Sequence, residues 1–302
     1  MNAKRKAAMR RTLTAYLVSA PSLILIGLIV VFPILYTGYI SLTNMNTYHW
    51  FSWDLVGMKN YRRALFLMDS GFVSALMTTI LWTAVNMGLQ LAIAFLIANL
   101  LNVRRLPLRN VYKTLLMFPW AMPGYVSILL WKTGMFNSQF GLLTRWMEQL
   151  SGLTVRWLQG DVSAFICCTA VNLWLALPFM IMIMDGGLKS IDRSYYECAT
   201  LDGAGPVRQA VSITLPCLAP IIAPSVLITV FTTFKQFDVI YLMTRQVGAQ
   251  TGANVHTVIT YAYEHAFITN NYGYSSAVSV LIFLILIAFA QLSGRGGKGE
   301  RA

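Results

Sequence analysis

Six long apolar segments constrain the fold of this chain more than any other feature of its sequence. They lie at approximately 14–40, 75–100, 112–133, 163–184, 218–243 and 275–293. Each can cross a bilayer, because about 20 helical residues span the roughly 30 Å hydrocarbon core. Hydrophobic residues make up 57% of the chain and charged residues only 11%, whereas soluble domains carry about 25% charged residues. The sequence therefore predicts an all-α fold, a polytopic bundle of six transmembrane helices forming one domain over 1–302.

The third segment is the least regular of the six, because Pro119 and Pro123 interrupt it. Proline removes a backbone N–H donor and kinks a helix. A membrane bundle tolerates such a break where neighbouring helices or a cavity satisfy the freed carbonyls. The first segment follows a basic stretch from Lys4 to Arg11, as the apolar core of a signal peptide would. It is too long for that role, so we interpret it as a retained first span.

The distribution of lysine and arginine predicts the orientation of the spans. These residues are concentrated in the N-terminal tail, in the 101–113 and 185–217 segments and at the C-terminus. Positively charged loops face the cytoplasm, so we expect an inner-membrane protein with both termini in the cytoplasm. The net charge of +12 then reflects topology, and we expect the bilayer but no nucleic acid as a partner. Residues 294–302 are Gly-rich and basic, which predicts a flexible tail.

Residue patterns typical of catalysis or metal binding are missing from the sequence. The 4 cysteines and 3 histidines show no zinc-like spacing. No paired acids, D-x-D or H-E-x-x-H motif occurs. We therefore expect no catalytic residues and no metal site, and predict that the chain is not an enzyme.

The 185–217 segment is long for a bundle connection and has its own helical pattern. Ser190 or Asp192 can cap a helix that Gly203 and Gly205-Pro206 would end. A second short helix would then lead to Leu215-Pro216 and the next span. Such a helix–Gly–helix unit suits docking into a groove of another protein. The spacing alone leaves a simple connector between two spans equally open.

The same segment resembles the EAA loop of binding-protein-dependent ABC permeases. The resemblance rests on a long pattern of fixed spacing, and Cys198 departs from the alanine usual in the family. The matching residues are Glu197, Ala199, Asp202, Gly203, Ala204, Ile213, Leu215 and Pro216. This resemblance implies the fold of a type I ABC importer permease, with 185–217 as its cytoplasmic coupling loop.

The resemblance extends over nearly the whole chain and is strongest to the carbohydrate permeases of the maltose-type (MalF-like) family. The segments 57–61, with its G-x-x-N-Y pattern, 118–123 and 135–137 match that family as well. Additional spans before the first one and a large folded insertion in an outer loop, both found in the family, are missing. We therefore expect the compact six-span form.

The resemblance also implies partners. A helix over 190–205 would sit in a cleft of a separate ATPase homodimer, with Glu197 paired to a basic group and Gly203 permitting the turn. A second, MalG-like permease subunit would complete the pathway, and an extracytoplasmic solute-binding protein would deliver an oligosaccharide. The chain has no G-x-x-x-x-G-K-[ST] motif. We therefore expect no cofactor in this chain, with ATP and Mg²⁺ bound by the partner ATPase.

Polar residues inside spans are candidates for substrate binding, because they are costly in a membrane. Thr229, Thr232, Thr233 and Gln236 follow helical spacing on one face of the fifth span. The pattern alone favours hydrogen bonds to neighbouring helices or to their own backbone. The resemblance implies instead that a malto-oligosaccharide-like substrate contacts the fourth and fifth spans. Its implied contacts are Leu175, Ala176, Phe179, Thr229, Thr232, Thr233, Gln236 and Asp238.

Lys235 admits two interpretations. It lies three residues from Asp238, so an ion pair across one helical turn is the favoured one. Lys235 would otherwise meet an acidic, uronate-type oligosaccharide. A secondary transporter is a less favoured alternative, because it would use intramembrane carboxylates. Asp238 is the single acid that falls inside the predicted spans.

Overall fold

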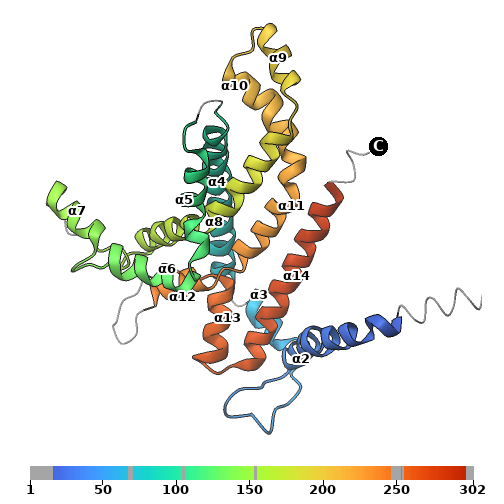
Figure 1. Ribbon diagram of the computed structural model, residues 1–302. Coiled ribbons are helices and arrows are strands. Elements are labelled where there is room, and N and C mark those ends of the chain that lie inside the picture. The colour runs from blue at the N-terminus through green and yellow to red at the C-terminus, as the bar shows by residue number, and fades with distance from the viewer. Residues whose placement is uncertain are drawn as a thin grey trace, which may run out of the picture. The chain divides into compact units, whose positions relative to one another are not determined.

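The computed structural model describes residues 16–66, 71–103, 106–152, 155–245, 253 and 255–296. Within these ranges the regular elements are helices, and no strand occurs (Figure 1). Five helices are long and apolar enough to cross a membrane, and a bent helix pair supplies a sixth crossing if it is counted as one span. The predicted all-α bundle is confirmed. The basic N-terminal stretch and most of the predicted tail lie outside the described residues.

The described chain divides into two compact units. Among the described residues, the first comprises 16–66, 71–73 and 261–294, and the second is formed mainly by those between 74 and 260. The helices of the first unit are the first span Tyr16–Ile40, which includes the π-helical η1 (Gly27–Val31) and α2 (Phe32–Ile40), then α3 (Lys59–Phe66), most of α13 (Val258–Phe267) and α14 (Tyr272–Gly296). The second contains α4 (Phe72–Leu101), α5 (Arg109–Ala121), α6 (Gly124–Leu130), η3 (Trp131–Met135), α7 (Leu142–Ser151), α8 (Asp161–Ser190), α9 (Arg193–Leu201), α10 (Pro206–Gln209), η4 (Ala210–Thr214), α11 (Leu215–Phe234) and α12 (Asp238–Thr244).

In the first unit, the 57–61 segment fixes the end of the first span. The amide of Asn60 donates to the carbonyls of Ser41, at 2.9 Å, and Thr43, at 2.8 Å. The hydroxyl groups of Tyr61 and Ser41 lie 2.6 Å apart. Gly57 has φ +58°, a left-handed conformation that glycine adopts without strain. The G-x-x-N-Y pattern therefore acts as a local clasp.

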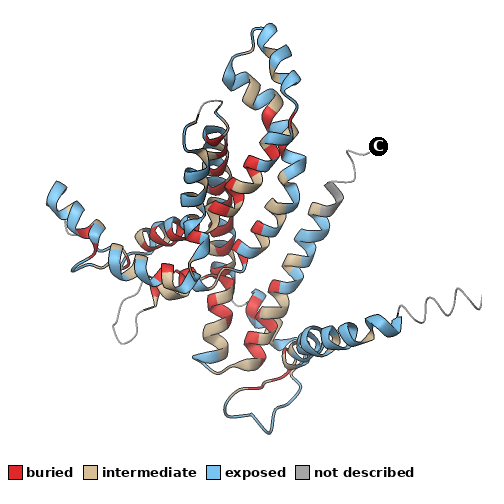
Figure 2. Cartoon of the chain, in the orientation of Figure 1, coloured by how far each residue is buried: buried red, intermediate tan, exposed pale blue. Residues whose placement is uncertain are grey.

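The second unit is built on α4 and α8, which bury the most side chains (Figure 2). Amide side chains join these two helices, since Asn172 donates to the side-chain oxygen of Asn86 at 2.8 Å. The amide of Gln90 donates to the carbonyl of Ala176 at 2.9 Å. Paired amides stabilise helix contacts where water is absent. They fix the register of the second span against the fourth.

The third span is bent by 93° between α5 and α6. Met122, with φ −88° and ψ 143°, leaves the helical region directly before Pro123. A proline disfavours the α conformation in the residue that precedes it, so the chain turns there. The predicted interruption is confirmed, and its sharpness is a structural finding.

The fifth span differs from the prediction at both ends. The helix is continuous from Pro206 through η4 to Phe234, so no separate short helix precedes the span. It breaks at 235–237 and resumes as α12. Irregular backbone in the 185–217 segment is accordingly limited to 191–192 and 202–205.

Candidate functional sites

The first candidate site is the α9–α10 unit, residues 192–214, which Figure 1 shows at the opposite end of the second unit from α6 and α12. Its first helix begins at Asp192, whose carboxylate accepts from the backbone N–H of Ser194 at 2.9 Å. This hydrogen bond holds the pKa of Asp192 below its usual range. A capping carboxylate satisfies one free N–H group of the first turn. Asp192 is thus the cap, and the hydroxyl of Ser190 donates to Gly187 instead.

The end of α9 is a Schellman turn centred on Gly203. The N–H of Ala204 donates to the carbonyl of Ala199 at 2.8 Å, and that of Gly203 to Thr200 at 3.1 Å. Gly203 has φ +76°, which residues with a Cβ adopt only at a cost. The side chain of Gln209 donates to the carbonyl of Ala204 at 2.9 Å. The glycine of the EAA-like pattern is therefore required by backbone geometry.

Two helical spans hold the α9–α10 unit. Only 191–192 separate α9 from α8, and α10 runs without a break into α11. The hydroxyl groups of Tyr196 and Thr214 lie 3.0 Å apart and join α9 to η4. Ile213 is half-buried beside Thr214, whereas Leu215 and Pro216 at the start of α11 are exposed. A displacement of α9 would therefore move the fourth and fifth spans together.

The outer surface of the α9–α10 unit is apolar and uncovered. The side chains of Tyr195, Leu201 and Val207 are 57%, 89% and 77% exposed. Glu197 and Asp202 are also exposed, and neither forms an ion pair with a described residue. Exposed apolar side chains next to an unpaired acid form the kind of patch that binds another protein.

The second candidate site is the break between α11 and α12. The hydroxyl of Thr229 donates to Ser225 at 2.8 Å, and that of Thr232 to its own helix at 2.9 Å. The interpretation that these threonines bond to the backbone of their own helix is therefore confirmed for Thr229 and Thr232. Thr233 is buried. Gln236 lies beyond the end of α11, so the prediction that it shares a helical face with the threonines is wrong.

The predicted ion pair between Lys235 and Asp238 does not form, although both residues are described. The helix ends at Phe234 and a new one begins at Asp238, so the two side chains are not one helical turn apart. Both are exposed. Lys235 is therefore open to another partner.

The fourth-span candidates lie on α8 and are half-buried. Leu175 packs against the core cluster that contains Val239 of α12. The carbonyl of Ala176 accepts from Gln90, and the ring of Phe179 lies 6.1 Å from that of Trp120. Among the described residues, no hydrogen bond or ring contact joins these three to the threonines of α11. The fourth-span and fifth-span candidates are therefore not joined directly within the described chain.

Asp185 is a charged site that the sequence analysis missed. It is buried in α8, which continues to Ser190, so Asp238 is not the single acid inside a span. Its carboxylate pairs with Lys113, with Lys189 at 2.5 Å and with Arg109 at 3.3 Å, and accepts from Asn102 at 3.0 Å. The paired carboxylate gives no support to an ion-driven mechanism. It joins the 101–113 segment to the C-terminal part of α8, which precedes α9.

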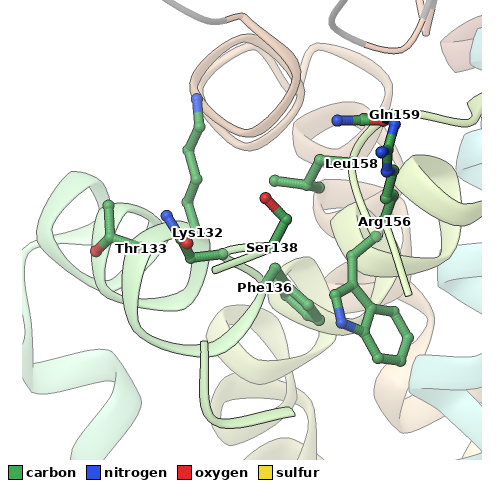
Figure 3. A pocket seen from close by; sticks show the side chains of 9 residues that line it. Lys132, Thr133, Phe136, Ser138, Arg156, Leu158 and Gln159 are labelled. Atoms are coloured by element: carbon green, nitrogen blue, oxygen red, sulfur yellow. Dashed lines mark hydrogen bonds between the residues drawn. The ribbon is translucent and has the colours of Figure 1, made fainter. Parts of the chain in front are cut away.

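A second missed feature is a hollow of about 280 Å³ beside η3 (Figure 3). Lys132 borders it, and its ammonium donates to the carbonyls of Leu242 and Arg245, both at 2.6 Å. These carbonyls lie at the C-terminal end of α12, which carries partial negative charge. The sequence signal that could have revealed this feature is Lys132 itself, a lone charged residue at the end of the third apolar segment. Lys132 therefore fixes α12, the helix that begins just after residues 235–237, which we call the polar break.

Comparisons with known proteins assign this architecture to a family. Residues 90–295 match the model of the binding-protein-dependent transport system inner membrane component. The trehalose/maltose transport system permease protein MalF of Thermococcus litoralis is 29% identical over 99% of both chains. The galactooligosaccharides transport system permease protein GanP of Bacillus subtilis is 30% identical, over 91% of this chain and 68% of that protein. MalF of Escherichia coli is 31% identical, over 78% of this chain but 47% of its own.

A solved structure has the same fold. The crystal structure of a bacterial ABC transporter involved in the import of the acidic polysaccharide alginate has a chain that aligns with a TM-score of 0.81. The alignment covers 99% of this chain and 100% of that one, at 16% identity, which establishes the fold alone. The chain belongs to the binding-protein-dependent transport system inner membrane components, and within them to the MalF-like ABC permeases.

Proposed function

We propose that this chain is one of two membrane-spanning subunits of an ATP-driven importer that moves an oligosaccharide by alternating access. The observation that carries this proposal is the α9–α10 unit. It is capped at Asp192, turned at Gly203 and joined rigidly to α8 and α11. A partner that displaces this unit would reorient two spans at once, which is what coupling requires.

The proposed motor is a separate ATPase homodimer that binds ATP and Mg²⁺. Its cleft would receive α9, cover Tyr195 and Leu201, and pair a basic group with Glu197. The coupling residues in this proposal are Glu197, Ala199, Asp202, Gly203, Ala204, Ile213, Leu215 and Pro216. The Asp185 cluster supports a common, cytoplasmic side for the 101–113 and 185–217 segments, because Arg109, Lys113 and Lys189 meet there. Both termini would then face the cytoplasm.

Two further partners complete the proposed importer. A MalG-like permease subunit would cover the first span, Tyr16–Ile40, in which this chain buries no residue. An extracytoplasmic solute-binding protein would deliver the substrate, in keeping with the family description.

Co-purification tests the docking proposal. Glu197→Lys reverses the charge on the docking surface, and Glu148→Lys makes the same change on α7, far from it in the sequence. Both glutamates are exposed. We expect the affinity-tagged wild type and Glu148→Lys to retain an ATPase subunit, and Glu197→Lys to lose most of it. Equal retention by both variants would contradict the docking role of α9.

The proposed substrate is a neutral, malto-oligosaccharide-like sugar. Three relatives are named for maltose, trehalose/maltose or galactooligosaccharide transport, which supports the carbohydrate class. The polar break supplies exposed hydrogen-bonding groups and α8 an aromatic face. The proposed contacts are Leu175, Ala176, Phe179, Thr229, Thr232, Thr233, Gln236 and Asp238.

An acidic, uronate-type oligosaccharide is the second candidate substrate. The observation that favours it is Lys235, which is exposed and forms no ion pair with Asp238. Lys235→Gln distinguishes the two candidates, with Lys59→Gln as the matched change at another exposed lysine. For a neutral substrate we expect both variants to import at wild-type rate. For a uronate, Lys235→Gln alone should raise the KM for import, by about tenfold if it removes about 1.4 kcal/mol of binding.

A further inference from the structure

The helix α7 has an apolar face that the described chain leaves uncovered. Leu142, Trp146 and Leu150 recur at a spacing of four residues, so they lie on one side of the helix. Their side chains are 49%, 61% and 86% exposed. Arg145 and Glu148 project from the other exposed side, Gln149 lies at its edge beside Leu142, and Thr144 is buried against the protein. A division of this kind is typical of helices that lie at a boundary between two media.

The orientation of α7 is fixed by its first turn. The hydroxyl of Thr144 donates to the carbonyl of Asn137 at 2.8 Å and accepts from the indole of Trp157 at 3.0 Å. A Cβ on Gly141 would lie 2.5 Å from the carbonyl oxygen of Met135, so the turn onto η3 is too tight for any other residue. Leu143 packs against the adjoining core cluster. These contacts therefore fix the direction in which the apolar face of α7 points.

The position of α7 along the chain identifies what covers this face. Residues 136–141 connect it to the end of the third span, and 152–160 connect it to the fourth. These short connections keep α7 at the membrane boundary. The first turns of α8 expose Val162 and Ile166, 75% and 61%, as a lipid-facing span does. The span that follows α7 thus begins with exposed apolar side chains, so lipid is the environment expected next to α7.

We infer that α7 is an interfacial helix whose apolar face inserts into the outer surface of the bilayer. Leu142, Trp146 and Leu150 contact the upper acyl chains, while Arg145 and Glu148 remain in water. Trp146 suits this position, because an indole ring has an apolar body and a polar N–H and concentrates at membrane interfaces. In this position α7 anchors the bent outer half of the third span to the bilayer surface.

Spin labels on the two sides of α7 test this inference. Cysteine replaces Trp146 or Leu150 on the apolar side, and Arg145 or Glu148 on the polar side. Cys198 and Cys217 are changed to serine, and the full assembly is reconstituted in phosphatidylcholine bilayers. Collisions are measured with oxygen, which concentrates in lipid, and with a nickel chelate, which stays in water. We expect oxygen to dominate at 146 and 150, and the nickel chelate to dominate at 145 and 148.

Three results would overturn the inference. High nickel accessibility at all four positions would place both sides of α7 in water. Shielding of 146 and 150 from both reagents without added partners would mean that protein, such as the second permease subunit, covers the face. Shielding from both reagents only after the binding protein is added would identify that protein as the occupant. The measurement involves no transport or ATP hydrolysis, so its outcome is independent of the proposed substrate and motor.

Discussion

At the residue scale, the Asp185 carboxylate balances cations that reach it from α5 and from its own helix. Asp185→Asn leaves Arg109, Lys113 and Lys189 without this counter-charge. Breaking a buried pair in this way costs about 3–5 kcal/mol. Lys189→Met should cost much less, because the Lys189 side chain is 46% exposed and water already solvates it. We expect a lower Tm of the purified chain for Asp185→Asn and a small change for Lys189→Met. A wild-type Tm for Asp185→Asn would mean that the cluster contributes little.

Lys132 is expected to restrain α12. Lys132→Met removes two charge-assisted hydrogen bonds to the carbonyls of Leu242 and Arg245, each typically worth about 1.5–3 kcal/mol. We expect faster amide hydrogen exchange in α12, measured by mass spectrometry, and partial recovery with Lys132→Arg. Thr133→Val is the control, because the Thr133 hydroxyl bonds only within its own helix. Unchanged exchange in Lys132→Met would show that other contacts hold α12.

His265, in α13 outside the spans, should make stability depend on pH. Burial and, secondarily, Arg63 lower the pKa of His265. The unfolded chain takes up this proton near pH 6.5, whereas the folded chain does so only at lower pH. The unfolded state therefore binds more protons, and stability falls as the pH drops below about 6.5. We expect Tm to fall between pH 7 and 5.5, and to fall less in His265→Gln. If the Tm of His265→Gln falls with pH as steeply as that of the wild type, His265 is not a source of the pH dependence.

Local sequence chemistry predicted some of these residues and could not predict others. The roles of Asp192 and Gly203 follow from capping and turn preferences within a few residues, and the structure has both. The partners of Asp185 and Lys132 lie on helices distant in the sequence, at Lys113 and Leu242 for example. No local pattern encodes such pairs. The ion pair expected between Lys235 and Asp238 failed for a related reason, because the helix break that separates them was not foreseen.

At the element scale, the Schellman turn of α9 gives a matched test. Gly203→Val places a β-branched residue at φ +76°, at a cost of about 1–3 kcal/mol. Gly205→Val makes the same change two residues later, where φ is −70° and the chain precedes a proline. We expect amide hydrogen exchange over 199–204 to be faster than in the wild type for Gly203→Val. For Gly205→Val we expect the wild-type exchange rate. Similar exchange in both variants would show that the left-handed turn is not what holds α9.

The spans themselves were the most predictable elements. Their apolar stretches give strong signals, so the predicted limits fall close to Phe72–Leu101 and Asp161–Ser190. The continuous helix from Pro206 to Phe234 is not evident from the sequence, because Leu215-Pro216 indicates a helix boundary. Pro216 lies inside this continuous helix, just after the π-helical η4, and Pro220 and Pro224 lie inside α11 as well. Packing against α8 outweighs the preference of proline to end a helix.

At the scale of the whole molecule, three features of the described chain remain exposed. Tyr16–Ile40 buries no residue, the polar break is half-open and the α9–α10 unit is uncovered. In the proposed importer, a second permease would cover the first span, an ATPase would cover the α9–α10 unit, and the polar break would meet the sugar that the solute-binding protein delivers. The sequence indicates these partners only through family resemblance, because a single sequence does not show which of its surfaces a partner covers.

The ATPase rate of the reconstituted assembly tests the central claim, that the α9–α10 unit couples a partner ATPase to sugar transport. The rate would be measured in bilayers with the binding protein, with and without malto-oligosaccharide, for wild type, Gly203→Val and Gly205→Val. We predict that the sugar-loaded binding protein stimulates wild type and Gly205→Val several-fold, whereas Gly203→Val stays near its basal rate. Equal stimulation of all three would contradict coupling through this unit, and no stimulation of wild type by any saccharide would contradict the importer itself.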